Sequence, residues 1–297
     1  MADNPEVNFE AAAAQSPPNV PLRPKLAAMT EFDHLEMSRA GRVLTLAFNR
    51  PEKLNAFNSH MHSEFARAIE LVAADPDSDI IVITGKGRAF SSGGDLDWQR
   101  AAAECTAMFE ITVREAKRIV FGLIDCEKPI IAKINGPAVG LGATVALFCD
   151  ISFMARSAYI SDPHVNVGMV AGDGGAVIWP QLIGFSRAKE LLFTGDRLAA
   201  VEAERLGLVN RAVEDAELDA AVSAFADRLT AQPQLALRYS KLTINTALRE
   251  LASSMMDVGL GYESLTNASQ DHREALSAIA EKRQPHFGVR RRPNEQT

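Results

Sequence analysis

Two glycine-rich stretches present main-chain groups that can do chemistry. The first, residues 133–154, leaves the apolar run 129–134, breaks at Asn135-Gly136-Pro137, and carries Gly140 and Gly142 just before an apolar segment. A strand that enters a glycine-rich turn and then a helix leaves unpaired N–H groups at the helix start. Such groups suit an anion or a developing oxyanion. The same glycines also fit a purely structural role, close packing of the helix on the strand.

The second stretch has the same layout. Residues 79–84 (DIIVIT) have the length and β-branched content of a buried strand, and Gly85–Trp98 follows with the run SSGGD at 91–95. The spacing of neither stretch matches the dinucleotide fingerprint G-x-G-x-x-G. We expect the two strand-to-helix junctions to converge on a single oxygen atom.

The chain resembles the crotonase superfamily of enoyl-CoA hydratases and isomerases along most of its length. The resemblance rests on five segments in order: FNRPEKLNAFN (48–58), GRAFSSGGDL (87–96), INGPAVGLGATVALFCDI (134–151), SRAKELLFTGDRLAAVEAERLGLVNRAV (186–213) and EALSAIAEKRQPHF (274–287). It implies a coenzyme A thioester substrate and no permanently bound cofactor. By motif matching it assigns the two backbone donors of an oxyanion hole to Ser92 and Leu141.

The same resemblance implies contacts to the rest of the substrate. These are expected from Leu54, Ala56, Arg88, Ala89, Phe90, Gly93, Gly94, Asp95 and Gly140. Asp95 is also expected to cap the helix that follows it. Lys282 and Arg283 either meet a phosphate of coenzyme A or are solvated helix charges.

The acid and base positions depart from the family pattern. Typical hydratases of this family use two glutamates, and the corresponding positions here are Thr144 and His164. A threonine hydroxyl is too weak an acid to replace a carboxylate, so Thr144 positions water or packs. His164 can shuttle a proton because imidazole titrates near neutrality, or it is structural. Asp173 either carries a proton or caps a helix beginning near Gly175.

Asp162, two residues before His164, either orients the imidazole or caps a turn.

Three candidate functions follow from the site residues. The first is hydration of an enoyl-CoA or a related acyl-CoA reaction, with His164 and Asp173 moving protons. The second is a one-base double-bond isomerase, which needs only one proton shuttle. The third is an acyl-CoA-binding protein that has lost the chemistry.

The elements that position these residues predict an α/β fold with a repeated ββα core and a C-terminal helical region. Residues 35–48 read as two strands turning at Ala40-Gly41, Ser59 begins a helix that Asp75-Pro76 ends, and one helical region covers 97–125. We expect a disordered extension at 1–30, the core with the acyl-CoA site at 31–200, and a nearly all-helical oligomerisation region at 201–297. The resemblance implies a homotrimer or a dimer of trimers.

Composition and charge argue against several classes of function. The chain has 297 residues, 47% hydrophobic and 23% charged, with a net charge of -7, which argues against nucleic-acid and anionic-membrane surfaces. It contains no apolar run of about 20 residues, and we expect a cytoplasmic protein. Cys105, Cys126 and Cys149 have no disulfide or zinc spacing, and we expect them to be reduced. His60 and His62 are expected to be solvated, without a metal.

Overall fold

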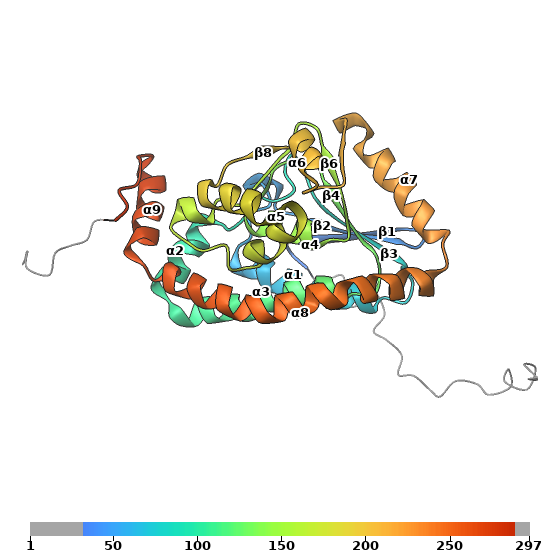
Figure 1. The fold of residues 1–297 in the computed structure, drawn as a ribbon, viewed down its shortest axis with the longest axis horizontal. Helices are drawn as coiled ribbons and strands as arrows, with labels where there is room; N and C mark the ends of the chain where they lie inside the picture. The colour runs from blue at the N-terminus through green and yellow to red at the C-terminus, as the bar shows by residue number, and fades with distance from the viewer. Residues whose placement is uncertain (1–31, 289–297) are drawn as a thin grey trace, which may run out of the picture.

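A six-stranded sheet lies at the centre of the fold. A computed structural model describes residues 32–288 and gives the strand order β1-β2-β3-β4-β6-β9 (Figure 1). The bounds are β1 Leu35–Ala40, β2 Val43–Phe48, β3 Ile80–Gly85, β4 Ile130–Ile134, β6 Ile151–Ala155 and β9 Arg211–Val213. β1 and β2 pair antiparallel, and every later neighbour pairs in parallel. Helices cover the parallel strands, which explains why their sequences are continuous apolar runs.

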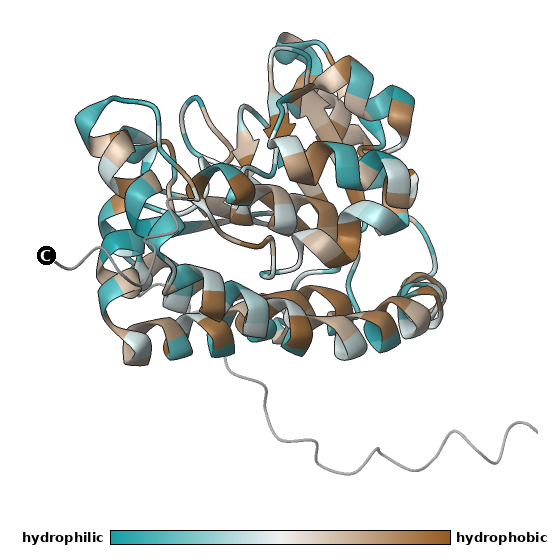
Figure 2. Ribbon diagram, turned by 60° about the vertical axis from the view of Figure 1, so that its left-hand side comes forward, coloured by the Kyte–Doolittle hydropathy of each residue, from teal (hydrophilic) through white to brown (hydrophobic). Residues whose placement is uncertain are grey.

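Nine helices surround the sheet within the described part of the chain. They are α1 Ser59–Ala74, α2 Leu96–Glu104, α3 Thr106–Asp125, α4 Leu141–Phe148, α5 Gly175–Thr194, α6 Ala200–Leu206, α7 Leu218–Thr230, α8 Gln234–Asn267 and α9 Gln270–Glu281. Figure 2 shows hydrophobic and hydrophilic residues alternating along the long helices, as expected where one face packs on the core. All eight residues of α4 are buried. α3 packs between α1 and α8, which runs along one side of the molecule (Figure 1).

A second, three-stranded sheet holds the segments nearest to the glycine-rich turns. It contains β5 Ala138–Val139, β7 Tyr159–Ser161 and β8 Leu198–Ala199, in the order β5-β7-β8. A short 3-10 helix, η4, follows β7 at His164–Val167. This small sheet therefore ties the turn before α4 to the segment that carries His164.

The sequence expectations for the fold are confirmed in class and corrected in detail. The fold is α/β with a helical C-terminal region, and α1 begins where Asn58 accepts a hydrogen bond from the Met61 amide. The single helix expected at 97–125 is two helices, because Cys105 has extended backbone angles. The region beyond residue 200, expected to be nearly all helical, also contributes one short strand, β9, which joins the sheet beside β6. The expected extension at 1–30 lies outside the described residues.

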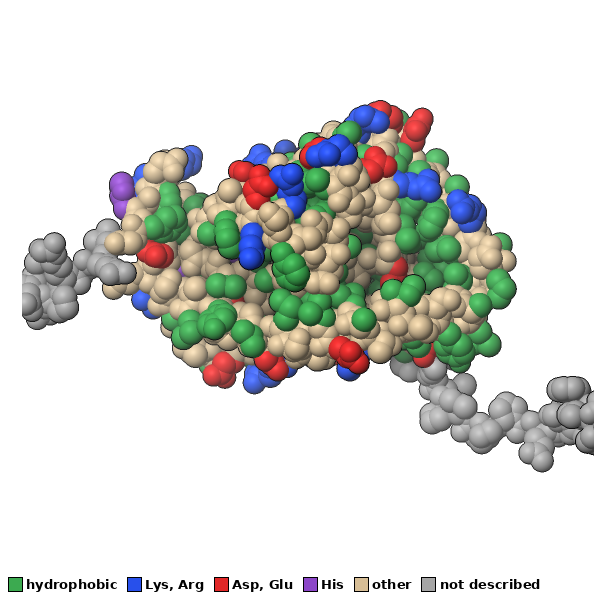
Figure 3. Space-filling model, viewed as in Figure 1, with side chains coloured by type: hydrophobic (Ala, Val, Ile, Leu, Met, Phe, Trp, Pro, Cys, Tyr) green, Lys and Arg blue, Asp and Glu red, His purple; other side chains and the backbone are tan. Residues whose placement is uncertain are grey.

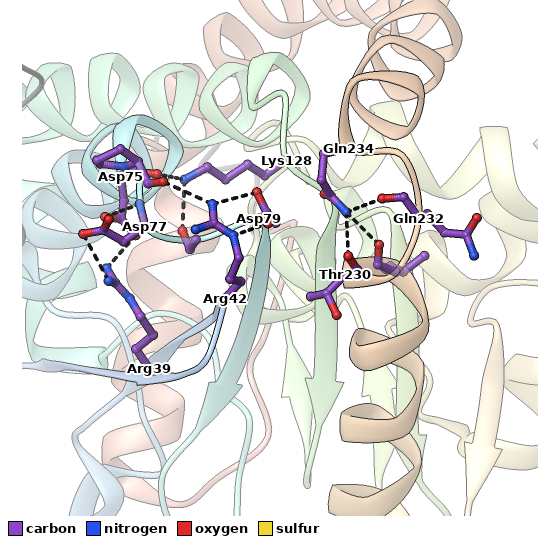
Figure 4. Close-up of polar contacts among 12 residues, drawn as sticks. Arg39, Arg42, Asp75, Asp77, Asp79, Lys128, Thr230, Gln232 and Gln234 are labelled. Carbon is purple, nitrogen blue, oxygen red and sulfur yellow. Dashed lines mark hydrogen bonds and ion pairs between the residues drawn. The ribbon is translucent and has the colours of Figure 1, made fainter.

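A buried polar network holds the end of α1 against the sheet and α8 (Figure 4). Lys128 is 3% exposed and donates hydrogen bonds to the main-chain oxygens of Val72 and Asp75 and to Ser78 Oγ. Burial lowers the pKa of Lys128 to about 8. Arg238 of α8 donates to Asp79 Oδ1 at 2.9 Å in the same network. Lys128 thus gives Asp75 O a donor and Val72 O a second one beside the Asp75 amide.

The structure also bears on membrane-spanning helices and on the cysteines. Among the described residues, no helix has both the length and the apolar character needed to cross a bilayer. Cys126 and Cys149 are buried and Cys105 is exposed, and all three are free thiols. Burial raises the pKa of the Cys149 thiol, which fits the expectation of a small buried hydrophobic residue.

Candidate active site

The two glycine-rich turns lie side by side. The Ser91 amide donates to Pro137 O at 3.0 Å, and the Val139 amide donates to Ser91 O at 2.9 Å. Gly93 makes this approach possible: its φ is +87°, and a Cβ there would lie 2.9 Å from Val139 O. The main chain after β3 and the main chain before α4 therefore form one surface.

The free amides on this surface differ from those expected. The Ser92 amide donates to Leu54 O at 3.0 Å, so its hydrogen is used by the fold, and the assignment of Ser92 as a donor is corrected. Gly94, two residues later, and Leu141, the first residue of α4, have amides without a hydrogen-bond partner within residues 32–288. Both residues line the same cavity. Gly94 and Leu141 thus each bring to the cavity a main-chain amide that the described residues leave without an acceptor.

The cavity beside these amides has a volume of about 210 Å³. Its apolar wall includes residues of three helices: α2 with Leu96, Trp98 and Ala102, α3 with Phe109, Val113 and Ala116, and α8 with Leu260. Its polar wall includes four titratable groups, His62, His164, Asp173 and Glu263, as well as the glycines 93, 94 and 140. Apolar walls with a few convergent polar groups are typical of a small-molecule site.

His164 lies at the start of η4 between two carboxylates. Its Nδ1 is 2.5 Å from Asp162 Oδ1, and its Nε2 is 3.7 Å from Asp173 Oδ2. Burial acts to lower the pKa of His164, but Asp162 and then Asp173 outweigh it and raise that pKa well above 6.5. Of the two roles considered for Asp162, orientation of the imidazole is the one that this contact supports. Asp162 and Asp173 therefore favour the protonated, positively charged form of His164.

Asp173 is 6% exposed and faces His164. Thr144 Oγ1 donates to its Oδ1 at 3.3 Å, and the Gly175 amide lies 3.4 Å from the same oxygen. The N-cap residue of α5 is Gly174, so the expectation of Asp173 as the cap is not met. Burial raises the pKa of Asp173, His164 opposes the rise, and Asp162 adds to it. Asp173 is thus a buried carboxyl with a hydrogen-bonded threonine beside it.

Glu263 of α8 is a site residue that the sequence analysis missed. It is 5% exposed and lines the cavity, and burial followed by repulsion from Asp173 raises its pKa to about 8. A sequence signal for it exists. Met256, Leu260, Glu263 and Asn267 fall on one helical stripe, and all four are buried. A glutamate on an apolar stripe is the pattern that indicates a buried acid.

The remaining predicted residues divide between the cavity and its support. Gly93, Gly94 and Gly140 line the cavity, whereas Ala89 and Phe90 are buried outside its lining. Leu54 and Ala56 support the neighbouring turn, and Arg88 is exposed. Asp95 is confirmed as a cap, since it accepts from the Asp97 amide at the start of α2. Arg283 pairs with Glu274 and Glu281, and Lys282 is exposed at the end of α9.

One histidine expectation is wrong. His60 is exposed, but His62 is only 1% exposed; it faces Glu115 at 2.7 Å and lines the cavity beside Trp98. The reason is that α1 turns the side chain of residue 62 toward α3, where Glu115 supplies an acceptor. His62 therefore belongs to the wall of the site rather than to the surface.

Two groups in the described chain bring three possible metal-ligand atoms within 4.8 Å of one another. The first group is Asp162, His164 and Asp173, and the second is His34, His60 and Glu64. In the first group, His164 Nδ1 already shares its hydrogen with Asp162. The arrangement is therefore explained by charge-assisted hydrogen bonding.

Comparisons with known proteins identify the family of the chain. Residues 38–290 match the family model described as enoyl-CoA hydratase/isomerase. Among curated relatives, a crotonyl-CoA hydratase of Syntrophomonas wolfei is 34% identical over 86% of this chain and 98% of its own length. A 1,2-epoxyphenylacetyl-CoA isomerase of Escherichia coli is 34% identical over 87% of this chain and 99% of its own.

The solved structures agree on the fold. An enoyl-CoA hydratase/isomerase from Mycobacterium paratuberculosis superposes with a TM-score of 0.80 at 36% identity, over 82% of this chain and 97% of the other. The fold and the site thus define a hydratase- or isomerase-type enzyme. The chain belongs to the enoyl-CoA hydratase/isomerase family.

Proposed function

We propose that the protein acts on an enoyl-CoA thioester through an enolate whose oxygen is held by the amides of Gly94 and Leu141. The observation that carries this proposal is that two unpartnered main-chain donors, counted within residues 32–288, line one cavity with His164 and Asp173. One preorganised donor of this kind stabilises a transition state by about 3 kcal/mol. The reaction is a proton transfer next to the thioester.

The charges of the site suggest how the proton moves. Asp162 bonds to the His164 imidazole and favours its protonated form, so we assign His164 the role of stabilising negative charge rather than of accepting a proton. Asp173 is the group that can accept one, because its raised pKa brings it closer to neutrality. Thr144 fixes the carboxyl by its hydrogen bond to Oδ1. Asp173 thus removes a proton from the carbon next to the thioester while the imidazolium balances the charge that develops.

This division of roles favours double-bond isomerisation. Hydration needs a group that activates water, and the two positions that hold glutamates in typical hydratases hold Thr144 and the protonated His164. Hydration remains the second candidate, since a crotonyl-CoA hydratase is among the relatives.

The assay that separates the candidates uses two substrates. Conversion of a 3-enoyl-CoA to the 2-enoyl-CoA raises the absorbance of the conjugated thioester, and hydration of crotonyl-CoA lowers it. We expect isomerisation to be at least tenfold faster in kcat/KM. Tight binding of acyl-CoA with neither reaction would refute the catalytic proposal and leave an acyl-CoA-binding protein.

We further propose that the chain assembles as a homotrimer or a dimer of trimers. Large apolar side chains are exposed on α5 and α8, where Figure 3 shows hydrophobic groups along the surface. They include Phe185 and Phe193 of α5 and Ile244, Tyr262 and Leu265 of α8. Light scattering on the purified protein checks this, and a mass of one chain of 32.1 kDa would contradict it.

A further inference from the structure

We propose that Glu263 is a second proton carrier of this site, which delivers a proton to the acyl chain while Asp173 removes one. This inference rests on the proposed function. It adds a catalytic acid from a C-terminal helix to a site that is otherwise built from the turns around the sheet. It also supplies a carboxyl to a site that lacks both glutamates of a typical hydratase.

Glu263 lies in the wall of the cavity, close to Asp173. Its side chain lines the cavity that holds Gly94, Leu141 and His164. A Cβ at Gly172, the residue before Asp173, would lie 2.8 Å from Glu263 Oε2. The glycine at 172 therefore lets the carboxyl sit beside the segment that carries Asp173. A ligand in the cavity meets both acids.

The contacts within the described fold do not explain why an acid stands at residue 263. Its Oε2 is buried and has no hydrogen-bond partner among the residues that the structure describes. Leaving a buried polar group unpaired costs about 1–3 kcal/mol. Asn267, one turn further along α8, shows the contrast, because its amide donates to Ala102 O at 3.0 Å and joins α8 to α2. Asn267 has a structural partner and Glu263 has none.

The protonation state fits delivery of a proton. The charged groups that face Glu263 are Asp173, His164 and Asp162, all from the segment between β7 and α5. Burial and the nearby Asp173 raise the pKa of Glu263 to about 8, so it holds its proton at neutral pH. An acid whose pKa lies near the working pH is the kind that transfers protons efficiently.

The reaction balances with these two acids. In a 3-enoyl-CoA, the C–H bond at the carbon next to the thioester breaks and its proton passes to the Asp173 carboxylate. The electron pair of that bond forms the thioester enolate, conjugated with the double bond. The O–H bond of Glu263 then breaks, its proton bonds to the fourth carbon, and the double bond settles between the second and third. A proton passes from Asp173 back to Glu263, which restores both groups.

The experiment separates the two halves of the reaction. A 3-enoyl-CoA is incubated in D2O with wild type or Glu263→Gln, and mass spectrometry follows deuterium entry next to the thioester while absorbance follows isomerisation. We expect Glu263→Gln to lower isomerisation at least 100-fold and deuterium entry less than tenfold. Glu263→Asp, which keeps an acid, should restore part of the isomerisation.

The matched control is Glu250→Gln, because Glu250 is an exposed glutamate of the same helix. It should behave as wild type in both measurements. An equal loss of both halves in Glu263→Gln would indicate a structural role and overturn the inference, as would unchanged isomerisation. A wild-type protein that neither exchanges nor isomerises would instead refute the proposed function itself.

Discussion

The buried carboxyl of Glu263 should make the stability of the protein depend on pH, and Glu263→Gln should remove that dependence. The pKa of this group is 4.5 in the unfolded chain and about 8 in the folded protein. Between these values the folded state keeps a proton that the unfolded state has released. The stabilising contribution is therefore complete below pH 4.5 and is lost as pH rises through 8.

The size of the effect follows from that interval. One pH unit corresponds to about 1.4 kcal/mol, so the whole interval of about 3.5 units corresponds to at most about 5 kcal/mol. Between pH 5.5 and 8 the difference should be about 3 kcal/mol. Glutamine keeps the shape of the side chain and has no such titration, so the variant gains stability relative to wild type as pH rises.

Urea unfolding at a fixed protein concentration measures this difference at several pH values. The free energy of unfolding of Glu263→Gln minus that of wild type should grow steadily from pH 5.5 to 8. Glu250→Gln, with its exposed carboxyl, should give a constant difference. A constant difference for Glu263→Gln as well would mean that Glu263 ionises as freely in the folded protein as in the unfolded chain, and the burial argument would be wrong.

Other changes test the rest of the site and its support. His164→Ala should lower kcat at least 100-fold while the Kd for acyl-CoA changes less than fivefold, because the imidazolium acts on the enolate; unchanged kcat would remove it from the mechanism. Asp173→Asn should lower kcat about 1,000-fold without lowering the free energy of unfolding, whereas a capping role would cost about 1 kcal/mol and no rate. Lys128→Met should lower the free energy of unfolding by about 3 kcal/mol, since Asp75 O and Ser78 Oγ lose their donor and Val72 O keeps only the Asp75 amide at 3.4 Å, with kcat unaffected. Gly93→Ala should lower both stability and kcat, because its Cβ would press on Val139 O.

Local signals explain which elements were predictable from the sequence. The strand at 80–85 is a run of β-branched residues, and α1 has a capping Asn58 at its start and Pro76 after its end. β9 lacks such a signal: it has three residues, none of them fully buried, and it becomes a strand only by pairing with β6. The break at Cys105 likewise follows no proline or glycine.

The sequence predicted which segments form the site, but not which individual main-chain groups are free in it. His164, Asp162 and Asp173 do meet, because β7, η4 and the turn before α5 follow one another along the chain. The identity of the free amide depends on Leu54 O, which takes the hydrogen of Ser92 and leaves that of Gly94 available. No local pattern reveals a partner so distant in sequence. Glu263 is the opposite case, because its position on an apolar stripe of α8 was a local signal that the sequence interpretation did not use.

The late strand β9 has a practical consequence for anyone shortening this protein. A fragment ending near residue 200 would keep both glycine-rich turns but would lose β9. The main-chain donors and acceptors of β6 that pair with β9 would then be exposed. Uncovered strands of this kind recruit other chains. We expect such a fragment to precipitate on expression. Tags, fusions and split sites should therefore be placed at the termini and not near residue 200.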